Sequence, residues 1–217
     1  MMVGSFVDKC LTEPGRVDAW LAGLDDRERA ALYTNAGEER AEMKRGRLLV
    51  DRIRQDETAG NLFANGRGQQ RLTCQLHGCE WVCILDAIVP ECGLFVELKT
   101  TGNTKPDWQE CNGRNVRRDW FNRYWLDMAI YQIAVDQNFE GDYDGFLVAG
   151  ILSDPVQVRG ISYDPEDCRR YAAGIAGNVR DILDWKSGVE EPPRCRKMDC
   201  EYCATFPMEI ERAVAWF

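Results

Sequence analysis

The stretch Asp86-Ala-Ile-Val-Pro-Glu-Cys-Gly-Leu-Phe-Val-Glu97-Leu-Lys99 contains two apolar runs separated by a short turn, and it ends in an acid and a lysine. Successive side chains of a β-strand point to opposite faces, so Glu97 and Lys99 should share one face while Leu98 takes the other. A turn at residues 90–93 would fold the strand that carries Asp86 back alongside. The sequence therefore predicts two carboxylates and a lysine at one end of a sheet.

This set of side chains suits a metal-dependent hydrolysis. Carboxylate oxygens are the ligands that hard divalent cations prefer, and such a cation lowers the pKa of a bound water. We expect Asp86, Glu97 and the backbone carbonyl of Leu98 to hold Mg²⁺ or Mn²⁺, and Lys99 to orient the water and stabilise developing charge. The alternative is a buried strand that merely ends in an exposed Glu and Lys.

The spacing of Asp86, Glu97 and Lys99, followed by Thr100-Thr101, resembles the core signature of the PD-(D/E)XK nuclease superfamily. A downstream helix with Tyr124 and Tyr131 resembles, more narrowly, the lambda-exonuclease and exodeoxyribonuclease VIII branch. The resemblance covers roughly residues 40–185. It implies a restriction-endonuclease-like α/β (α+β) fold, in which a mixed central sheet is flanked by helices in the order αβββαβ.

Hydrophobic periodicity and turn residues predict an element order that agrees with this core. We expect helices over residues 14–34, 36–53, 119–137 and 164–185, and strands over 71–75, 80–88, 94–99, 145–152 and 156–163. Residues 56–70 are expected to form a loop and residues 100–119 an irregular segment. His77, the single histidine, falls in the turn of the first hairpin and is interpreted as a loop residue.

Glu42 is the predicted additional metal ligand. It shares a helix face with Gly46, Leu49 and Ile53, and in the resembled family a helix before the sheet often supplies an acid or a histidine to the metal. Glu39, one turn earlier, is the reserve candidate. The alternative is that Glu42 only borders the core and reaches water.

Tyr131 is the second residue whose role the resemblance implies. Relatives commonly place a glutamine one turn before such a tyrosine, whereas this chain has Asp127 there and Gln132 just after Tyr131. We expect Tyr131 to belong to the catalytic site. The alternative is that Tyr124, Met128, Tyr131 and Val135 form an ordinary core stripe.

Length and composition predict one core: 217 residues with 45% hydrophobic content. We expect an N-terminal helical segment at 1–35, a nuclease core at 36–188 and a cysteine-rich tail at 189–217. There is no long apolar run typical of a signal peptide or a membrane span, so we expect a soluble, cytoplasmic protein that does not contact a membrane.

The net charge of −9 counts against a broad nonspecific grip on DNA, which depends on neutralising phosphates. Any contact with DNA should therefore be local. The candidate DNA-binding residues are basic and interleaved with Trp108, Trp120, Phe121 and Trp125: Lys105, Arg114, Arg117, Arg118 and Arg123. The alternative is a helix start with a solvated basic face.

The chain has ten cysteines, and three of them lie close together in the tail: Cys195, Cys200 and Cys203. Closely spaced thiolates suit zinc or an iron–sulfur cluster, but a closed site needs a fourth ligand. The tail resembles that of PD-(D/E)XK exonucleases, including CRISPR-associated ones, which add one cysteine from before the nuclease motif. Cys10 stands in that place, so a [4Fe–4S] cluster or Zn²⁺ is predicted, with free thiols as the alternative.

The resemblance implies a metal-dependent deoxyribonuclease, an exonuclease acting on the ends of linear duplex DNA in phage-type recombination or DNA processing. It also implies a homo-oligomer that encloses DNA and a single-strand annealing protein as partner. Two alternatives remain open. One is a noncatalytic DNA-binding or regulatory module on the same fold, and the other is a restriction-type endonuclease.

Overall fold

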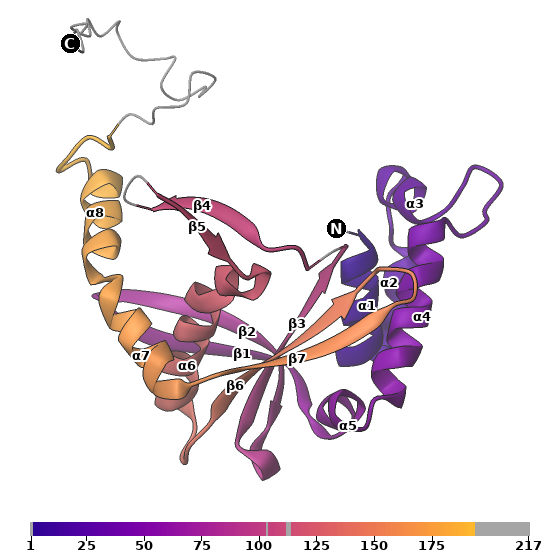
Figure 1. The fold of residues 1–217 in the computed structure, drawn as a ribbon, viewed down its shortest axis with the longest axis horizontal. Helices are drawn as coiled ribbons and strands as arrows, with labels where there is room; N and C mark the ends of the chain where they lie inside the picture. The colour runs from indigo at the N-terminus through magenta and orange to yellow at the C-terminus, as the bar shows by residue number, and fades with distance from the viewer. Residues whose placement is uncertain (1, 103, 112–113, 194–217) are drawn as a thin grey trace, which may run out of the picture. The chain divides into compact units, whose positions relative to one another are not determined.

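The structure is a computed structural model that describes residues 2–102, 104–111 and 114–193 (Figure 1). Contacts divide the chain into two units, Met1–Ile175 and Ala176–Phe217. The second unit contains the helix α8 (Ala176–Ser187) in its described part. All other described helices and strands belong to the first unit, and the predicted boundaries at residues 35 and 188 stay a prediction.

A five-stranded mixed sheet forms the centre of the first unit. Its strands follow the order β1 (Arg67–Leu76), β2 (Cys79–Val89), β3 (Leu94–Thr101), β6 (Asp144–Ile151) and β7 (Gln157–Tyr163). The β3–β6 pair is parallel and the other three pairs are antiparallel. This sheet with its flanking helices confirms the predicted fold class.

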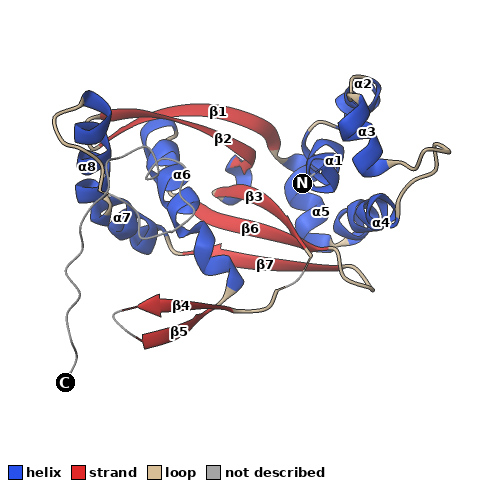
Figure 2. Cartoon of the chain, turned by 90° about the horizontal axis from the view of Figure 1, so that it is seen from above, coloured by secondary structure: helices blue, strands red, loops and turns tan. Residues whose placement is uncertain are grey.

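Helices cover both faces of the sheet (Figure 2). One face packs against helices from the start of the chain: α1 (Met2–Thr12), α4 (Ala41–Gln55) and α5 (Glu57–Asn65). The short helices α2 (Val17–Ala22) and α3 (Asp26–Leu32) also belong to that group. The other face packs against α6 (Trp125–Asn138) and α7 (Pro165–Gly174). Adjacent residues of β3 show the alternation: Val96 and Leu98 enter the first core, and Phe95 enters the second.

The β2–β3 turn forms as predicted. Residues Pro90–Cys92 make a single 3₁₀ turn, and Gly93 follows with φ of +60°, in the left-handed region. A Cβ atom on Gly93 would lie 2.7 Å from the backbone oxygen of Asp142, so both conformation and space require glycine here. This turn brings the strand of Asp86 beside the strand of Glu97.

The expected loop over residues 56–70 is wrong. Asp56 caps α5 by accepting a hydrogen bond from the backbone N–H of Ala59, and β1 begins at Arg67. Gly60 suggested a loop, but it lies where the end of α4 approaches α5, and a Cβ atom there would be 2.6 Å from the oxygen of Arg54. The glycine serves a close helix contact.

Three further expectations differ from the structure. The predicted helix over 14–34 is broken, since a 3₁₀ turn at Pro14–Arg16 precedes α2 and Asp25 forms a capping box with Glu28 that starts α3. The segment 100–119 is not irregular but contains a hairpin of β4 (Asp107–Cys111) and β5 (Arg114–Arg118). The predicted helix over 164–185 is two helices, although Asp164 caps α7 as expected. No helix in the described ranges is long and apolar enough to cross a membrane.

Candidate metal centre and active site

The two predicted carboxylates lie where β2 and β3 separate. These strands pair at Val89 with Leu94, Ile88 with Phe95 and Ala87 with Val96, and the pairing stops there. Continuing the register by one residue would place Asp86 opposite Glu97. Instead, Oδ2 of Asp86 accepts a hydrogen bond of 2.7 Å from the backbone N–H of Leu98. The side chain of Asp86 therefore satisfies a strand N–H at the point where the ladder ends.

Lys99 lies on the same face as Glu97, as the strand period predicts. Its Nζ atom is 2.5 Å from Oε1 of Glu97 and 3.9 Å from Oδ2 of Asp127 on α6. It also lies 5.4 Å from the centroid of the Tyr124 ring. Burial opposes the charged form of Lys99, but the nearby carboxylates outweigh it and raise the pKa of the ammonium. Lys99 is therefore held as a cation.

The carboxylates are deeply buried and repel each other. Burial is the main cause that raises the pKa of Asp86 to about 8, and the charges of Glu97 and Asp8 add to it. Burial likewise raises the pKa of Glu97 against the opposing effect of Lys99. Only 4% of Glu97 is exposed, and its Oε2 atom is buried without a hydrogen-bond partner. A buried acceptor without a partner destabilises the fold, and a bound ion or water at this oxygen would remove that cost.

These donors fit a hard divalent cation. Asp86 and Glu97 supply two carboxylates, one with an unpartnered oxygen, beside a cavity of about 530 Å³. In the part of the chain that the structure describes, no group of three or more His, Cys, Asp or Glu side chains has metal-binding spacing. Mg²⁺ is commonly held by one or two carboxylates with waters and substrate phosphate completing the shell. Asp86, Glu97 and the carbonyl of Leu98 would hold it here.

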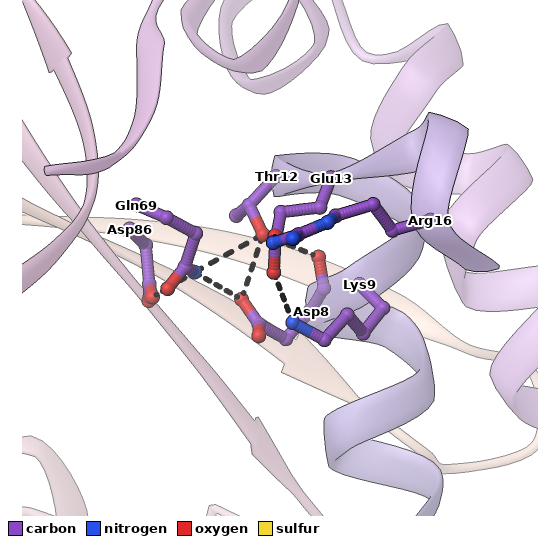
Figure 3. Close-up of polar contacts among 7 residues, drawn as sticks. All are labelled: Asp8, Lys9, Thr12, Glu13, Arg16, Gln69 and Asp86. Atoms are coloured by element: carbon purple, nitrogen blue, oxygen red, sulfur yellow. Dashed lines mark hydrogen bonds and ion pairs between the residues drawn. The ribbon is translucent and has the colours of Figure 1, made fainter. Parts of the chain in front are cut away.

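Asp86 also contacts a group of polar side chains that no sequence pattern predicted (Figure 3). The Nε2 atom of Gln69 donates to Oδ1 of Asp86 at 3.3 Å, to Oδ1 of Asp8 at 3.3 Å and to Oγ1 of Thr12 at 3.1 Å. Burial raises the pKa of Asp8, against a hydrogen bond from Thr12. Asp8 and Thr12 lie on α1 and Gln69 on β1, so no local spacing links them to Asp86.

The backbone of Gln69 is unusual. Its φ is +48°, a left-handed conformation that residues other than glycine adopt rarely. Gly68 pairs with Ala87 and Gln70 with Leu85, while Gln69 and Asp86 between them make no ladder pair. The local departure turns the amide of Gln69 toward Asp86 and Asp8, as Figure 3 shows.

Glu42 lines the same cavity as Asp8, Asp86, Glu97 and Lys99, although its residue is exposed. The buried face of α4 contains Gly46, Leu49 and Ile53, as predicted. The reserve candidate, Glu39, pairs with Arg47 at 2.6 Å. Glu42 therefore lies at the cavity wall, and its part in metal binding stays a prediction.

Tyr131 on α6 is half-buried, and the charges of nearby carboxylates act on its phenol. Burial raises its pKa, and the charges of Glu97, Asp127 and Asp86 raise it further, so the phenol keeps its proton. The adjacent Gln132 is fully buried, and its Nε2 atom donates to Asp136 and to the backbone oxygen of Tyr143. Gln132 is thus part of the core, and Asp127 occupies the position one turn before Tyr131.

Among the described candidates, none of Lys105, Arg117, Arg123, His77 and Cys10 lines the cavity beside the carboxylates. The residues Lys105, Arg117 and Arg123 are exposed, and Arg114 and Arg118 lie on β5 with side chains outside the described part. His77 is a turn residue as expected, and its Nε2 atom lies 2.7 Å from the backbone oxygen of Ala172. Cys10 is a buried free thiol on α1. Its three predicted partners, Cys195, Cys200 and Cys203, lie outside the described residues.

A family model described as "PDDEXK-like domain of unknown function (DUF3799)" matches residues 1–205. The chain belongs to this PDDEXK-like family. The match confirms the predicted PD-(D/E)XK superfamily. Asp86 lies on β2 and Glu97 and Lys99 lie on β3.

Two solved structures were compared with the fold of this chain. A crystal structure of a protein called "Putative exonuclease" from Eubacterium rectale superposes with a TM-score of 0.77 and 24% identity, covering 98% of this chain and 76% of that one. At this identity the similarity establishes the fold. The structure of SSO0001 matches with a TM-score of only 0.30 and 14% identity, covering 92% of each chain. No curated protein matches the chain.

Proposed function

We propose that this PDDEXK-like protein is a divalent-metal-dependent deoxyribonuclease that hydrolyses phosphodiester bonds. The observation that carries the proposal is the buried, unpartnered Oε2 atom of Glu97 next to Asp86, with Lys99 fixed 2.5 Å from the other oxygen. Two buried carboxylates that repel each other are unfavourable without a cation. The presence of both carboxylates beside a lysine favours an enzyme over a noncatalytic module.

In this proposal Asp86, Glu97 and the Leu98 carbonyl hold Mg²⁺ or Mn²⁺, and Glu42 contributes from the cavity wall. A bound divalent cation supplies Lewis acidity, which lowers the pKa of water and offsets phosphate charge. The ammonium of Lys99, held by Glu97, donates a hydrogen bond to the attacking water or a phosphate oxygen. Tyr131 keeps its proton and donates a hydrogen bond toward the same site.

The type of nuclease, its DNA substrate and its partners are inferred from the sequence resemblance. We infer an exonuclease of the lambda-exonuclease branch that acts on ends of linear DNA in phage-type recombination, in the cytoplasm of the cell or host. A ring-like homo-oligomer, a single-strand annealing partner and an iron–sulfur or zinc site of Cys10 with the tail cysteines belong to the same inference. Lys105, Arg114, Arg117, Arg118 and Arg123 would contact the DNA.

The test is digestion of end-labelled linear DNA and closed circular DNA with Mg²⁺ or Mn²⁺, with EDTA as the metal-free control. Digestion confined to linear DNA is expected, whereas nicked circles would indicate the restriction-type endonuclease. Lys99→Ala should lower the rate at least about a hundredfold while leaving DNA binding intact. Lys44 is an exposed lysine, so the Lys44→Ala variant is the matched control and should cleave DNA at the wild-type rate. Absence of digestion with either metal would contradict the proposal and favour the noncatalytic module.

A further inference from the structure

The β4–β5 hairpin is a two-stranded ribbon that directly follows the active-site strand β3 in the sequence. Within the described strands, β4 and β5 pair only with each other and stay separate from the five-stranded sheet (Figure 2). The ribbon follows β3, which carries Lys99, and leads into a 3₁₀ helix, Trp120–Tyr124. The ring of Tyr124 contacts Lys99. Both ends of the ribbon are therefore tied to elements of the active site.

Trp120, shortly after the ribbon, is buried, and the two ribbon side chains that the structure describes, Trp108 and Arg117, are exposed. Trp120 is only 6% exposed and makes edge contacts with Phe121 and Tyr124. Trp108, on β4, is 68% exposed. An isolated two-stranded ribbon is marginally stable in water, and an indole has a large apolar surface that favours contact with a partner. The exposed tryptophan therefore indicates a binding surface rather than a packing residue.

The partner of Trp108 across the ribbon is a cation. Trp108 pairs directly with Arg117 in the antiparallel register, and both side chains are exposed. Directly paired residues project from the same face, with Cβ atoms about 4.5–5.5 Å apart. The ribbon thus presents an aromatic plane and a guanidinium side by side.

The charge around this pair differs from that of the whole chain. The segment 105–123 contains five basic and three acidic residues, whereas the full chain has a net charge of −9. A positive segment in an acidic protein suits a polyanion and concentrates its contact locally.

We propose that the Trp108–Arg117 pair binds an unpaired strand of nucleic acid, with the indole stacked on a base and the guanidinium on a neighbouring phosphate. The inference rests on the proposed function and specifies how the substrate strand reaches the active site. A single strand is favoured over a duplex because its bases have free faces on which an aromatic ring can stack.

Equilibrium binding without metal tests this inference separately from cleavage. In EDTA, fluorescence anisotropy compares a labelled DNA single strand of about 16 nucleotides with a blunt duplex of the same sequence. Trp108→Ala should weaken single-strand binding about tenfold and change duplex binding little. Trp108→Phe should retain most of the affinity, whereas Trp108→Leu should resemble Trp108→Ala because leucine has no aromatic face.

Arg117→Ala should weaken single-strand binding and reduce the slope of log affinity against log salt by about 0.7. Arg159 on β7 is also exposed, so Arg159→Ala is the matched control and should bind normally. Thermal unfolding of each variant should match the wild type, because the replaced side chains are exposed.

Unchanged single-strand binding by Trp108→Ala and Arg117→Ala would overturn the inference. An equal loss for the blunt duplex would also overturn it, because the ribbon would then contact duplex backbone. Failure of the wild type to cleave DNA with metal would contradict the proposed nuclease activity instead, and the binding data in EDTA would still decide the role of the ribbon.

Discussion

Asp86 and Leu98 are joined across β2 and β3 by a hydrogen bond of 2.7 Å from a backbone N–H to a carboxylate oxygen. The last ladder pair is Ala87 with Val96, and the bond joins the next residue on β2 to the second residue onward on β3. It satisfies the backbone N–H of Leu98. It also fixes Asp86 beside Leu98, whose backbone carbonyl is a proposed metal ligand. One side chain therefore has both a structural and a proposed metal-binding role.

Asp86→Asn should separate these two roles. The amide oxygen can still accept the hydrogen bond from Leu98, so the fold should be kept, but the charge needed by a cation is lost. We expect Mn²⁺ binding by calorimetry and DNA cleavage to fall at least about a hundredfold. The melting temperature without metal at neutral pH should change little, because a carboxyl with a pKa of about 8 is mainly neutral there, as asparagine is.

The exposed Asp51 on α4 offers a control, since Asp51→Asn should change neither metal binding nor melting temperature. Wild-type Mn²⁺ affinity in Asp86→Asn would mean that Asp86 is not a ligand.

The stability of the metal-free protein should fall as pH rises. The pKa of Asp86 is about 8 in the folded chain against an ordinary 3.8, mainly through burial and next through Glu97. Between these two values the folded state binds more protons than the unfolded state, so the contribution of this group is complete at low pH and disappears as pH rises through about 8. Urea unfolding in EDTA across this range measures the effect.

Asp86→Asn should flatten this dependence, and an unchanged slope in that variant would refute the assignment. In the wild type, a metal must displace the same proton, so its apparent affinity should increase with pH up to about 8.

Gln69→Ala should weaken metal binding without contacting the metal. Its amide holds Asp86, Asp8 and Thr12 together, and loss of such outer contacts typically lowers metal affinity about tenfold to a hundredfold. The neighbouring Gln70 donates to the backbone oxygen of Gly68 instead, so Gln70→Ala is the matched control. Mn²⁺ titration of both variants should show a loss only for Gln69→Ala, and equal affinities would exclude a positioning role.

Glu42→Gln should lower Mn²⁺ affinity about tenfold if Glu42 contributes from the cavity wall. Glu39 lies on the chain just before α4 but pairs with Arg47, so Glu39→Gln should leave metal binding unchanged. The same titration compares them. A normal affinity in Glu42→Gln would reduce the proposed protein ligands to Asp86, Glu97 and the Leu98 carbonyl.

The sequence alone determined the local features of this protein. Alternation along β3 placed Glu97 and Lys99 on one face, the turn before Gly93 returned the chain, and Asp164 marked the start of a helix. These features depend on residues a few positions apart, and their spacing is visible in one dimension.

Only the tertiary structure decided how the site is supported. Gln69 reaches Asp8 and Asp86 from a strained backbone, and Glu97 keeps an oxygen without a partner. Gly60, which predicted a loop, lies instead in α5 where that helix contacts the end of α4. The contacts of Gln69 join segments far apart in the chain that meet through packing, whereas Gly60 depends on the angle between two consecutive helices. Burial and the electrostatic repulsion that follows from it arise only once that packing exists.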